Sequence, residues 1–125
     1  MIIIEHGNIQ SAAGTVVSNG SIGFILNTDG TVIASPGGFV SSQIELIFQL
    51  DNTGNIVQPA QLYSNAELDP QNSTIGLGTW YEVCFYTQSG ARINQPLLWQ
   101  FTQPANSTVD IGTMVPFSPA YEYPF

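Results

Sequence analysis

The sequence predicts an all-β fold, an antiparallel β-sandwich of six to eight strands. Three observations point to it. Charged residues make up only 8% of the 125 residues, while β-branched and aromatic residues, glycine and proline are plentiful, a composition that suits pleated surfaces and tight turns. Short β-rich runs end in turn signals at intervals of roughly ten residues, the spacing of sandwiches and small barrels. No amphipathic helix of crossover length is present, as a parallel α/β sheet would require.

The first half of the chain contains a predicted hairpin and the clearest single strand. Residues 22–26 lead into the turn sequence Asn-Thr-Asp-Gly at 27–30, and a second β-rich run follows at 31–34. Two such runs around Asp-Gly predict a hairpin. Residues 43–50 alternate between two faces, as a strand with one buried face does. The face expected to point to the core carries Ile44, Leu46, Phe48 and Leu50.

The second half of the chain contains a strand with two apolar faces. Residues 79–87 place Tyr81, Val83 and Phe85 on one face and Trp80, Cys84 and Tyr86 on the other. Such a strand is expected inside a sheet, covered on both sides. Residues 97–102 form the last strong strand. We therefore expect a single β-sandwich domain over 1–113, followed by an extended proline-rich and aromatic tail over 114–125.

Both ends of the sequence are unusually apolar. Three consecutive isoleucines follow Met1, and the tail 114–125 combines three prolines with aromatic side chains. Prolines keep a segment extended and reduce the entropy that it loses when it orders on a partner. The residues expected to dock on neighbouring subunits are Ile2, Ile3, Ile4, Phe117, Tyr121, Tyr123 and Phe125.

The charge balance excludes two classes of partner. Arg92 is the only basic side chain, and the formal net charge is −8. Nucleic-acid binding requires several cations to displace counterions from phosphates, so DNA and RNA are excluded. An anionic membrane surface is excluded for the same reason, and no apolar run is long enough for membrane insertion. No basic leader precedes the isoleucines, so we expect synthesis in a cytoplasm without a signal peptide.

The reactive side chains predict a protein that is not an enzyme and holds no cofactor. The chain has one histidine, His6, and one cysteine, Cys84, far apart in the sequence. Neither a Ser-His-Asp arrangement nor an activated thiol is therefore indicated, and Cys84 is expected to be buried and inert. A Cys/His metal site is excluded by count. The loop acids lack the dense spacing of a calcium loop, although calcium binding by them stays open.

A ten-residue stretch carries a resemblance to a known family. Residues 77–86, Leu-Gly-Thr-Trp-Tyr-Glu-Val-Cys-Phe-Tyr, resemble the strand that follows the tyrosine corner in fibronectin type III and related immunoglobulin-like domains. In those domains the tyrosine hydroxyl bonds to upstream backbone. The resemblance implies that Tyr81 takes this place, with Val83 and Phe85 below it in the core.

A wider stretch, residues 76–113, is similar to domains of tailed-phage virion proteins. The similarity lies in the strand at 78–86, the Ser-Gly turn after it, Leu-Trp-Gln-Phe at 98–101 and Ser-Thr-Val-Asp-Ile-Gly at 107–112. Such domains serve in tail fibres, baseplates, adaptors and capsid decorations. The resemblance implies a virion structural protein, made in the host cytoplasm, that packs on other virion proteins and on further copies of itself and can aid host adsorption.

Two alternatives stay open from the sequence. The first is a carbohydrate-binding module that recognises a cell-surface glycan by stacking sugars on exposed aromatic rings. Its candidate residues are Trp99, Trp80 and Tyr63, although strand tryptophans are more often core residues. A phage adsorption protein can combine both roles. The second alternative is a fibronectin-like spacer within a larger assembly.

Overall fold

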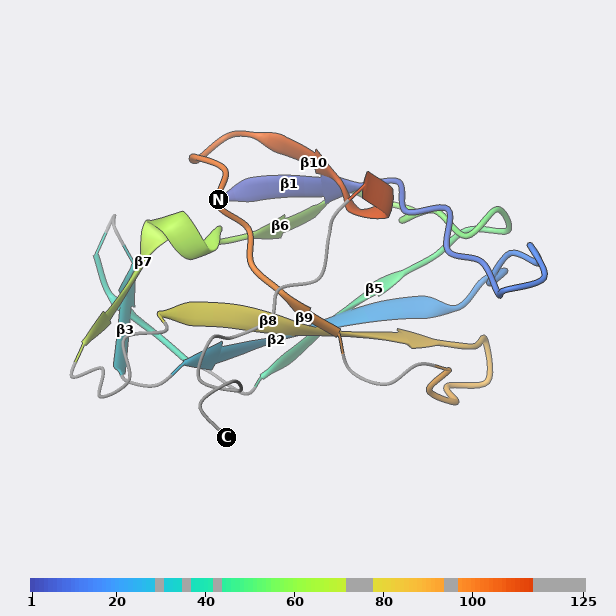
Figure 1. The fold of residues 1–125 in the computed structure, drawn as a ribbon, viewed down its shortest axis with the longest axis horizontal. Helices are drawn as coiled ribbons and strands as arrows, with labels where there is room; N and C mark the ends of the chain where they lie inside the picture. Colours follow the sequence, from blue (N-terminus) through green and yellow to red (C-terminus); the bar gives the residue numbers. More distant parts are fainter. Residues whose placement is uncertain (29–30, 35–36, 42–43, 72–77, 94–96, 114–125) are drawn as a thin grey trace.

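Two β-sheets face each other across a hydrophobic core, and a third sheet lies at one end of them (Figure 1). The computed structural model describes residues 1–28, 31–34, 37–41, 44–71, 78–93 and 97–113. These residues form ten strands, two short 3-10 helices and no α-helix. The predicted all-β sandwich is confirmed. Six to eight strands is too low a count, because several observed strands have only two or three residues.

The two main sheets differ in their pairing. The first has the order β10 (Thr108–Asp110), β1 (Ile2–Glu5), β6 (Ala60–Leu62), with β1 parallel to β10 and antiparallel to β6. The second has the order β5 (Glu45–Gln49), β2 (Ser21–Thr28), β8 (Thr79–Tyr86), β9 (Leu97–Trp99) and is antiparallel throughout. The third sheet has the order β4 (Phe39–Val40), β3 (Thr31–Ala34), β7 (Leu68–Gln71). The 3-10 helices are η1 (Asn65–Glu67) and η2 (Ile111–Thr113).

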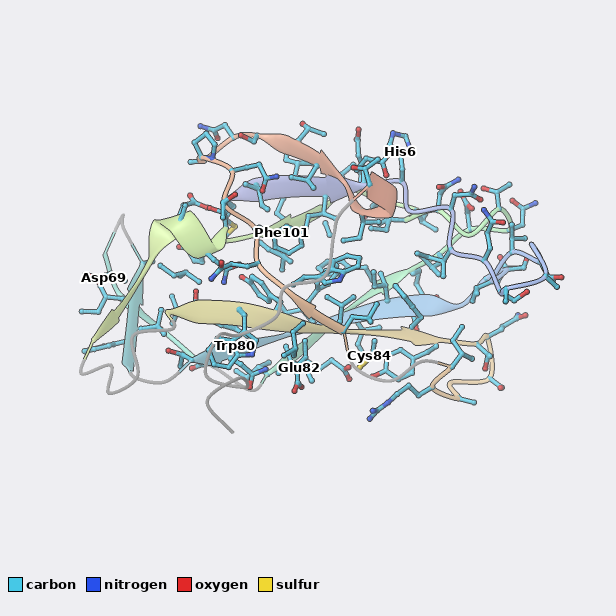
Figure 2. The ribbon with its side chains drawn as sticks, in the orientation of Figure 1. His6, Asp69, Trp80, Glu82, Cys84 and Phe101 are labelled. Atoms are coloured by element: carbon cyan, nitrogen blue, oxygen red, sulfur yellow. The ribbon has the colours of Figure 1, made fainter. Side chains whose placement is uncertain are left out.

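Aromatic rings fill the centre of the core. The ring centroids of Phe24 on β2, Tyr81 on β8 and Phe101 after β9 lie 5.7 to 6.4 Å apart. Trp99 meets Phe101 edge-to-face at 6.4 Å. Edge-to-face and tilted arrangements are those that the ring quadrupoles favour. Figure 2 shows Phe101 between the two sheets, where it is fully buried.

The hairpin predicted over residues 22–34 is wrong. β2 and β3 belong to different sheets, since β2 pairs with β5 and β8 whereas β3 pairs with β4 and β7. Both sides of β2 are therefore occupied by strands from distant parts of the chain, which satisfy its backbone groups in place of its sequence neighbour. The turn residues 29–30 lie outside the described residues.

β8 lies inside its sheet, between β2 and β9, as its two apolar faces predicted. Tyr81 and Val83 belong to the core and are at most 4% exposed. On the opposite face, Trp80 and Cys84 are 9% and 2% exposed. Figure 2 shows Trp80, Glu82 and Cys84 extending from β8 away from the core. The prediction that Cys84 is buried is confirmed, and burial raises the pKa of its thiol.

The hydroxyl of Tyr81 bonds to upstream backbone, as the resemblance to immunoglobulin-like domains implied. It donates to the carbonyl oxygen of Tyr63 at 2.6 Å. The acceptor lies 18 residues upstream, whereas a tyrosine corner reaches back only a few residues. The bond therefore ties β8 to the segment after β6. Burial, with the charge of Glu67 adding to it, raises the pKa of Tyr81, so that the hydroxyl keeps the proton that it donates.

Glu67 is a buried carboxylate next to this contact. It accepts hydrogen bonds from the Ser64 N–H at 2.8 Å and from the α-ammonium of Met1 at 2.9 Å. Burial by itself would raise the pKa of Glu67, but these two donors and the charge of the ammonium hold it below its ordinary value. Charge-assisted bonds of this kind are stronger than neutral ones, and here they hold η1 against the start of β1.

Candidate interaction surface along strand β5

β5 is an edge strand of the four-stranded sheet. The Leu50 N–H points toward β2 and donates to the carbonyl oxygen of Gly20 at 2.9 Å. The Gln49 carbonyl points away from β2 and accepts the Val57 N–H, also at 2.9 Å. Because successive residues of an edge strand present their backbone groups to opposite sides, the N–H and C=O groups of Glu45 and Ile47 point away from β2. No other described residue pairs with them. They form a short row of free donors and acceptors, which a further strand can bind.

Exposed apolar side chains surround this edge on both faces. Seven large apolar side chains are exposed in the part of the chain that the structure describes. Five of them lie on β5 or beside it, and these are Phe39, Ile44, Leu46, Ile47 and Val57. Their exposed fractions run from 43% to 81%. Single exposed apolar residues are ordinary on a soluble protein, whereas a contiguous group marks a contact surface.

A groove opens on the inner side of β5. Its volume is about 360 Å³, and its walls include Ile44 and Leu46, Phe39 of β4, Leu26 of β2 and Tyr81 of β8. On the outer side, a hollow of about 250 Å³ lies between Ile47, Phe48 and Val57. The lining of both is mainly apolar, so a partner that fills them removes apolar surface from water.

The core face predicted for residues 43–50 is confirmed only in its second half. Leu50 is 2% exposed, and Phe48 packs against the core. Leu46 and Ile44 line the groove and are 43% and 59% exposed. Strand alternation thus identified the correct face, but no described element covers the first half of it. Residue 43 lies outside the described residues.

The one charged side chain of β5 is turned back over the sheet. The Glu45 Oε2 atom accepts a hydrogen bond from the Tyr86 hydroxyl at 2.5 Å. Between them lies β2, where Gly23 pairs with Ile47 on one side and Cys84 on the other. A β-carbon at position 23 would lie 2.6 Å from Glu45 Oε2. Glycine therefore leaves the space in which the carboxylate crosses β2 and is withdrawn from the edge.

Replacing Gly23 by alanine is expected to break this hydrogen bond. The bond to Glu45 raises the pKa of Tyr86 from 10.0 to about 12, with burial and the carboxylate's charge adding to it. In Gly23→Ala the displaced carboxylate no longer faces the hydroxyl, so the pKa should fall toward 10. An NMR titration of the ring carbons, with Tyr86→Phe to assign the signal, measures it.

The same pKa determines how the contact depends on pH. Because the folded-state pKa is raised, the hydrogen bond stabilises the fold below pH 10 and is lost as the pH rises through about 12. Glu45→Gln is the control, since it keeps an acceptor oxygen but removes the charge and should lower the pKa only in part. An unchanged Tyr86 pKa in Gly23→Ala contradicts the role given to the glycine.

Two of the three isoleucines predicted to dock on neighbours, Ile2 and Ile4, are core residues. Ile2 and Ile4 are fully buried, and Ile3 is half-buried. Their backbone pairs with β6 and β10 on both sides. Contact with a neighbour through Ile2 or Ile4 would require this sheet to open, so this part of the prediction is corrected. The other predicted docking residues, Phe117, Tyr121, Tyr123 and Phe125, lie outside the described residues.

The aromatic residues predicted to stack on a glycan are not exposed as that role requires. Trp99 is 5% exposed and packs on Phe101 in the core. Trp80 is 9% exposed on the outer face of β8. Tyr63 is half-buried, packs against the core and lines the groove beside β5. The three side chains therefore do not form an exposed aromatic surface on which a sugar could stack.

The described residues contain no group of three or more His, Cys, Asp or Glu side chains that could hold a metal ion. His6 is 61% exposed, and its Nε2 atom lies 3.2 Å from Glu5 Oε1, whereas Cys84 is buried in the other main sheet. In the described part of the chain, no helix has the length and apolar character needed to cross a bilayer.

The alternation of residues 43–50 predicted the strand, but it did not identify the β5 edge as an interaction site. The signal that could have pointed to it is Ile47, an apolar residue on the face assigned to solvent.

Comparison of the chain with family models, curated proteins and solved structures found no match in any of the three.

Proposed function

We propose that this chain is a structural domain without catalytic activity, which packs on neighbouring subunits of a bacteriophage particle as part of a tail, an adaptor or a capsid decoration. One observation carries the packing role: in the described part of the chain, nothing pairs with the outward backbone groups of Glu45 and Ile47 on the apolar edge strand β5, and the one carboxylate of this strand is turned away. Soluble proteins ordinarily protect such an edge with charge, proline or a covering element. None of the described residues protects the β5 edge in this way, and such an edge fits a protein that works inside an assembly.

The composition supports the same role. The chain has no lysine and only 8% charged residues, so few long charged side chains have to be immobilised when its surface is covered. Interfaces are depleted in lysine and glutamate for this reason among others. The particle as the setting is supported by the similarity of residues 76–113 to tailed-phage virion domains. The glycan alternative gains no support, because Trp80 and Trp99 are buried.

The test of this function is particle association. Particles made by the phage or prophage that carries the gene are purified on a density gradient, and the chain is quantified in the particle fraction by mass spectrometry. We expect stoichiometric amounts in the particles. We also expect Ile47→Lys to remain in the soluble fraction, because a lysine on β5 blocks the apolar edge.

Ile93→Lys is the matched control, since Ile93 is 46% exposed compared with 53% for Ile47. The Ile93 N–H donates to the carbonyl oxygen of Phe85 on β8, which β2 separates from β5. Replacing Ile93 should therefore leave the amount of chain in the particles unchanged. Absence of the wild-type chain from every particle fraction would falsify the proposal.

A further inference from the structure

We propose that two copies of this chain pair through β5, in an antiparallel contact across a twofold axis that passes beside Leu46. The inference deepens the proposed function by naming one neighbour, a second copy, and its surface. It rests on the geometry of the edge and on the match of this strand with itself.

The backbone of β5 is complementary to its own copy. The outward groups belong to Glu45 and Ile47, and antiparallel strands exchange hydrogen bonds between residues that face each other. With Leu46 opposite Leu46, Glu45 of each copy faces Ile47 of the other, and all four residues find partners. A twofold contact uses the same patch on both subunits, and this register meets that condition.

The two adjacent symmetric registers are less favourable. Centring the contact on Glu45 would bring the acidic Glu45 residues of the two copies opposite each other, which is less favourable than placing each of them opposite Ile47. Centring it on Ile47 would place Glu45 opposite Gln49, whose carbonyl already accepts the Val57 N–H. The Leu46 register avoids both. It also places the Ile44 side chain of each copy near Phe48 of the other, which extends the apolar groove across the axis.

The withdrawn carboxylate removes the main electrostatic obstacle at the contact. An outward Glu45 would place a negative charge on each edge, but its Oε2 atom is held by Tyr86 on the face of the sheet. The remaining repulsion is long-range, because each copy carries a net charge of −8. Salt screens charges separated by more than about 8 Å at physiological ionic strength. Pairing should therefore strengthen as salt is added.

The exposed apolar area is sufficient for a modest dimer. The exposed fractions of Phe39, Ile44, Leu46, Ile47 and Val57 together equal about three complete side chains. At about 150 Å² for each, the lower end of the range for an aromatic side chain and used here for the aliphatic ones as well, two copies offer about 900 Å² before backbone and polar atoms are added. Specific interfaces begin at about 1,000 Å² in total.

The tail 114–125 is a poorer occupant of the edge. Pro116, Pro119 and Pro124 lack the N–H that a pairing strand must donate. β5 contains no proline, so it can supply every donor that the partner requires. Protection of the edge by the tail is the competing outcome, and it would leave the full-length chain monomeric.

Sedimentation equilibrium of the full-length chain tests the pairing. We expect a monomer–dimer equilibrium with dimer present at about 0.1 mM, the affinity range of small interfaces. Ile47→Lys should raise the dissociation constant at least tenfold. Ile93→Lys should leave it unchanged, and both variants should keep the wild-type circular dichroism spectrum.

Gly23→Ala gives a second, independent variant. It releases Glu45 toward the edge, so it should weaken dimerisation while Glu45→Gln does not. A wild type that stays monomeric at about 1 mM, a concentration that detects even weak contacts, overturns the inference. Equal dimerisation by Ile47→Lys and wild type also overturns it.

Cysteine cross-linking tests the register. A residue on the twofold axis faces itself in a non-hydrogen-bonded pair, with Cα atoms about 4.5 Å apart, which is within the range of a disulfide. Leu46→Cys should therefore form a covalent dimer under mild oxidation. Ile47→Cys lies diagonal to itself at about 7 to 8 Å and should not. The native Cys84 is buried, so the wild-type chain is the negative control and should form no covalent dimer.

The two proposals fail separately. A monomeric chain that is nevertheless found in particles refutes β5 self-pairing and leaves the structural role in place. A chain that dimerises through β5 but is absent from particles refutes the phage setting and leaves the dimer in place.

Discussion

Phe101→Ala is expected to lower the free energy of unfolding by about 3 to 5 kcal/mol, the range for removing a buried aromatic side chain. Phe101 is fully buried, and its ring contacts those of Phe24, Tyr81 and Trp99. Its backbone N–H is held by Asn65 Oδ1 at 2.7 Å. This hydrogen bond holds the backbone at residue 101 in place, so the backbone cannot easily move into the cavity that the missing ring would leave. The loss of unfolding free energy should therefore lie near the upper end of this range.

Urea denaturation followed by tryptophan fluorescence measures this loss, at a concentration low enough to keep the chain monomeric. Phe39→Ala is the matched control, because the side chain of Phe39 is 81% exposed and its removal should cost less than about 0.5 kcal/mol. A loss below about 1 kcal/mol for Phe101→Ala, less than an ordinary core truncation costs, would show that the core does not close around this ring.

Gly20→Ala is expected to lower the free energy of unfolding by about 3 kcal/mol, the upper end for forcing extra atoms into a packed site. A β-carbon at position 20 would lie 2.1 Å from the carbonyl oxygen of Tyr86 and 2.8 Å from Val17 Cγ1. The carbonyl belongs to β8, which is fixed by β2, so the overlap can be relieved only by moving a strand. Thermal unfolding measures the loss.

Gly90→Ala provides the comparison for this substitution. Gly90 has a φ of +91°, and no atom lies within 4 Å of an added β-carbon. Its replacement therefore costs only backbone strain, about 1 to 2 kcal/mol. If Gly20→Ala proves no more destabilising than Gly90→Ala, close approach of the β8 backbone is not what requires glycine at position 20.

Patterns within single strands were readable from the sequence. The two apolar faces of residues 79–87 predicted an interior strand, and β8 lies between β2 and β9. The alternation of residues 43–50 predicted which face of β5 turns inward. Both patterns arise because successive strand residues point to opposite faces, a local property that sequence carries directly.

Which strands pair with each other, and which apolar side chains are exposed, could not be predicted from the sequence in the same way. The Asp-Gly signal predicted that residues 22–26 pair with 31–34, but β2 instead pairs with β5 and β8. The three isoleucines looked like a docking segment, yet Ile2 and Ile4 lie in the core because β6 and β10 pair with β1 on both sides. Each error concerns a choice between partners that are distant in the chain.

Fold class and surface composition could be inferred before folding was considered, because strand propensity, turn residues and charge content are properties of short segments. The position of β5 at a sheet edge, and the path of the Glu45 side chain across Gly23 to Tyr86, could be seen only in the folded chain. A backbone donor or acceptor is free or satisfied depending on which distant strand lies beside it. The same apolar strand would be core at the centre of the sheet, and at its edge it presents exposed apolar side chains.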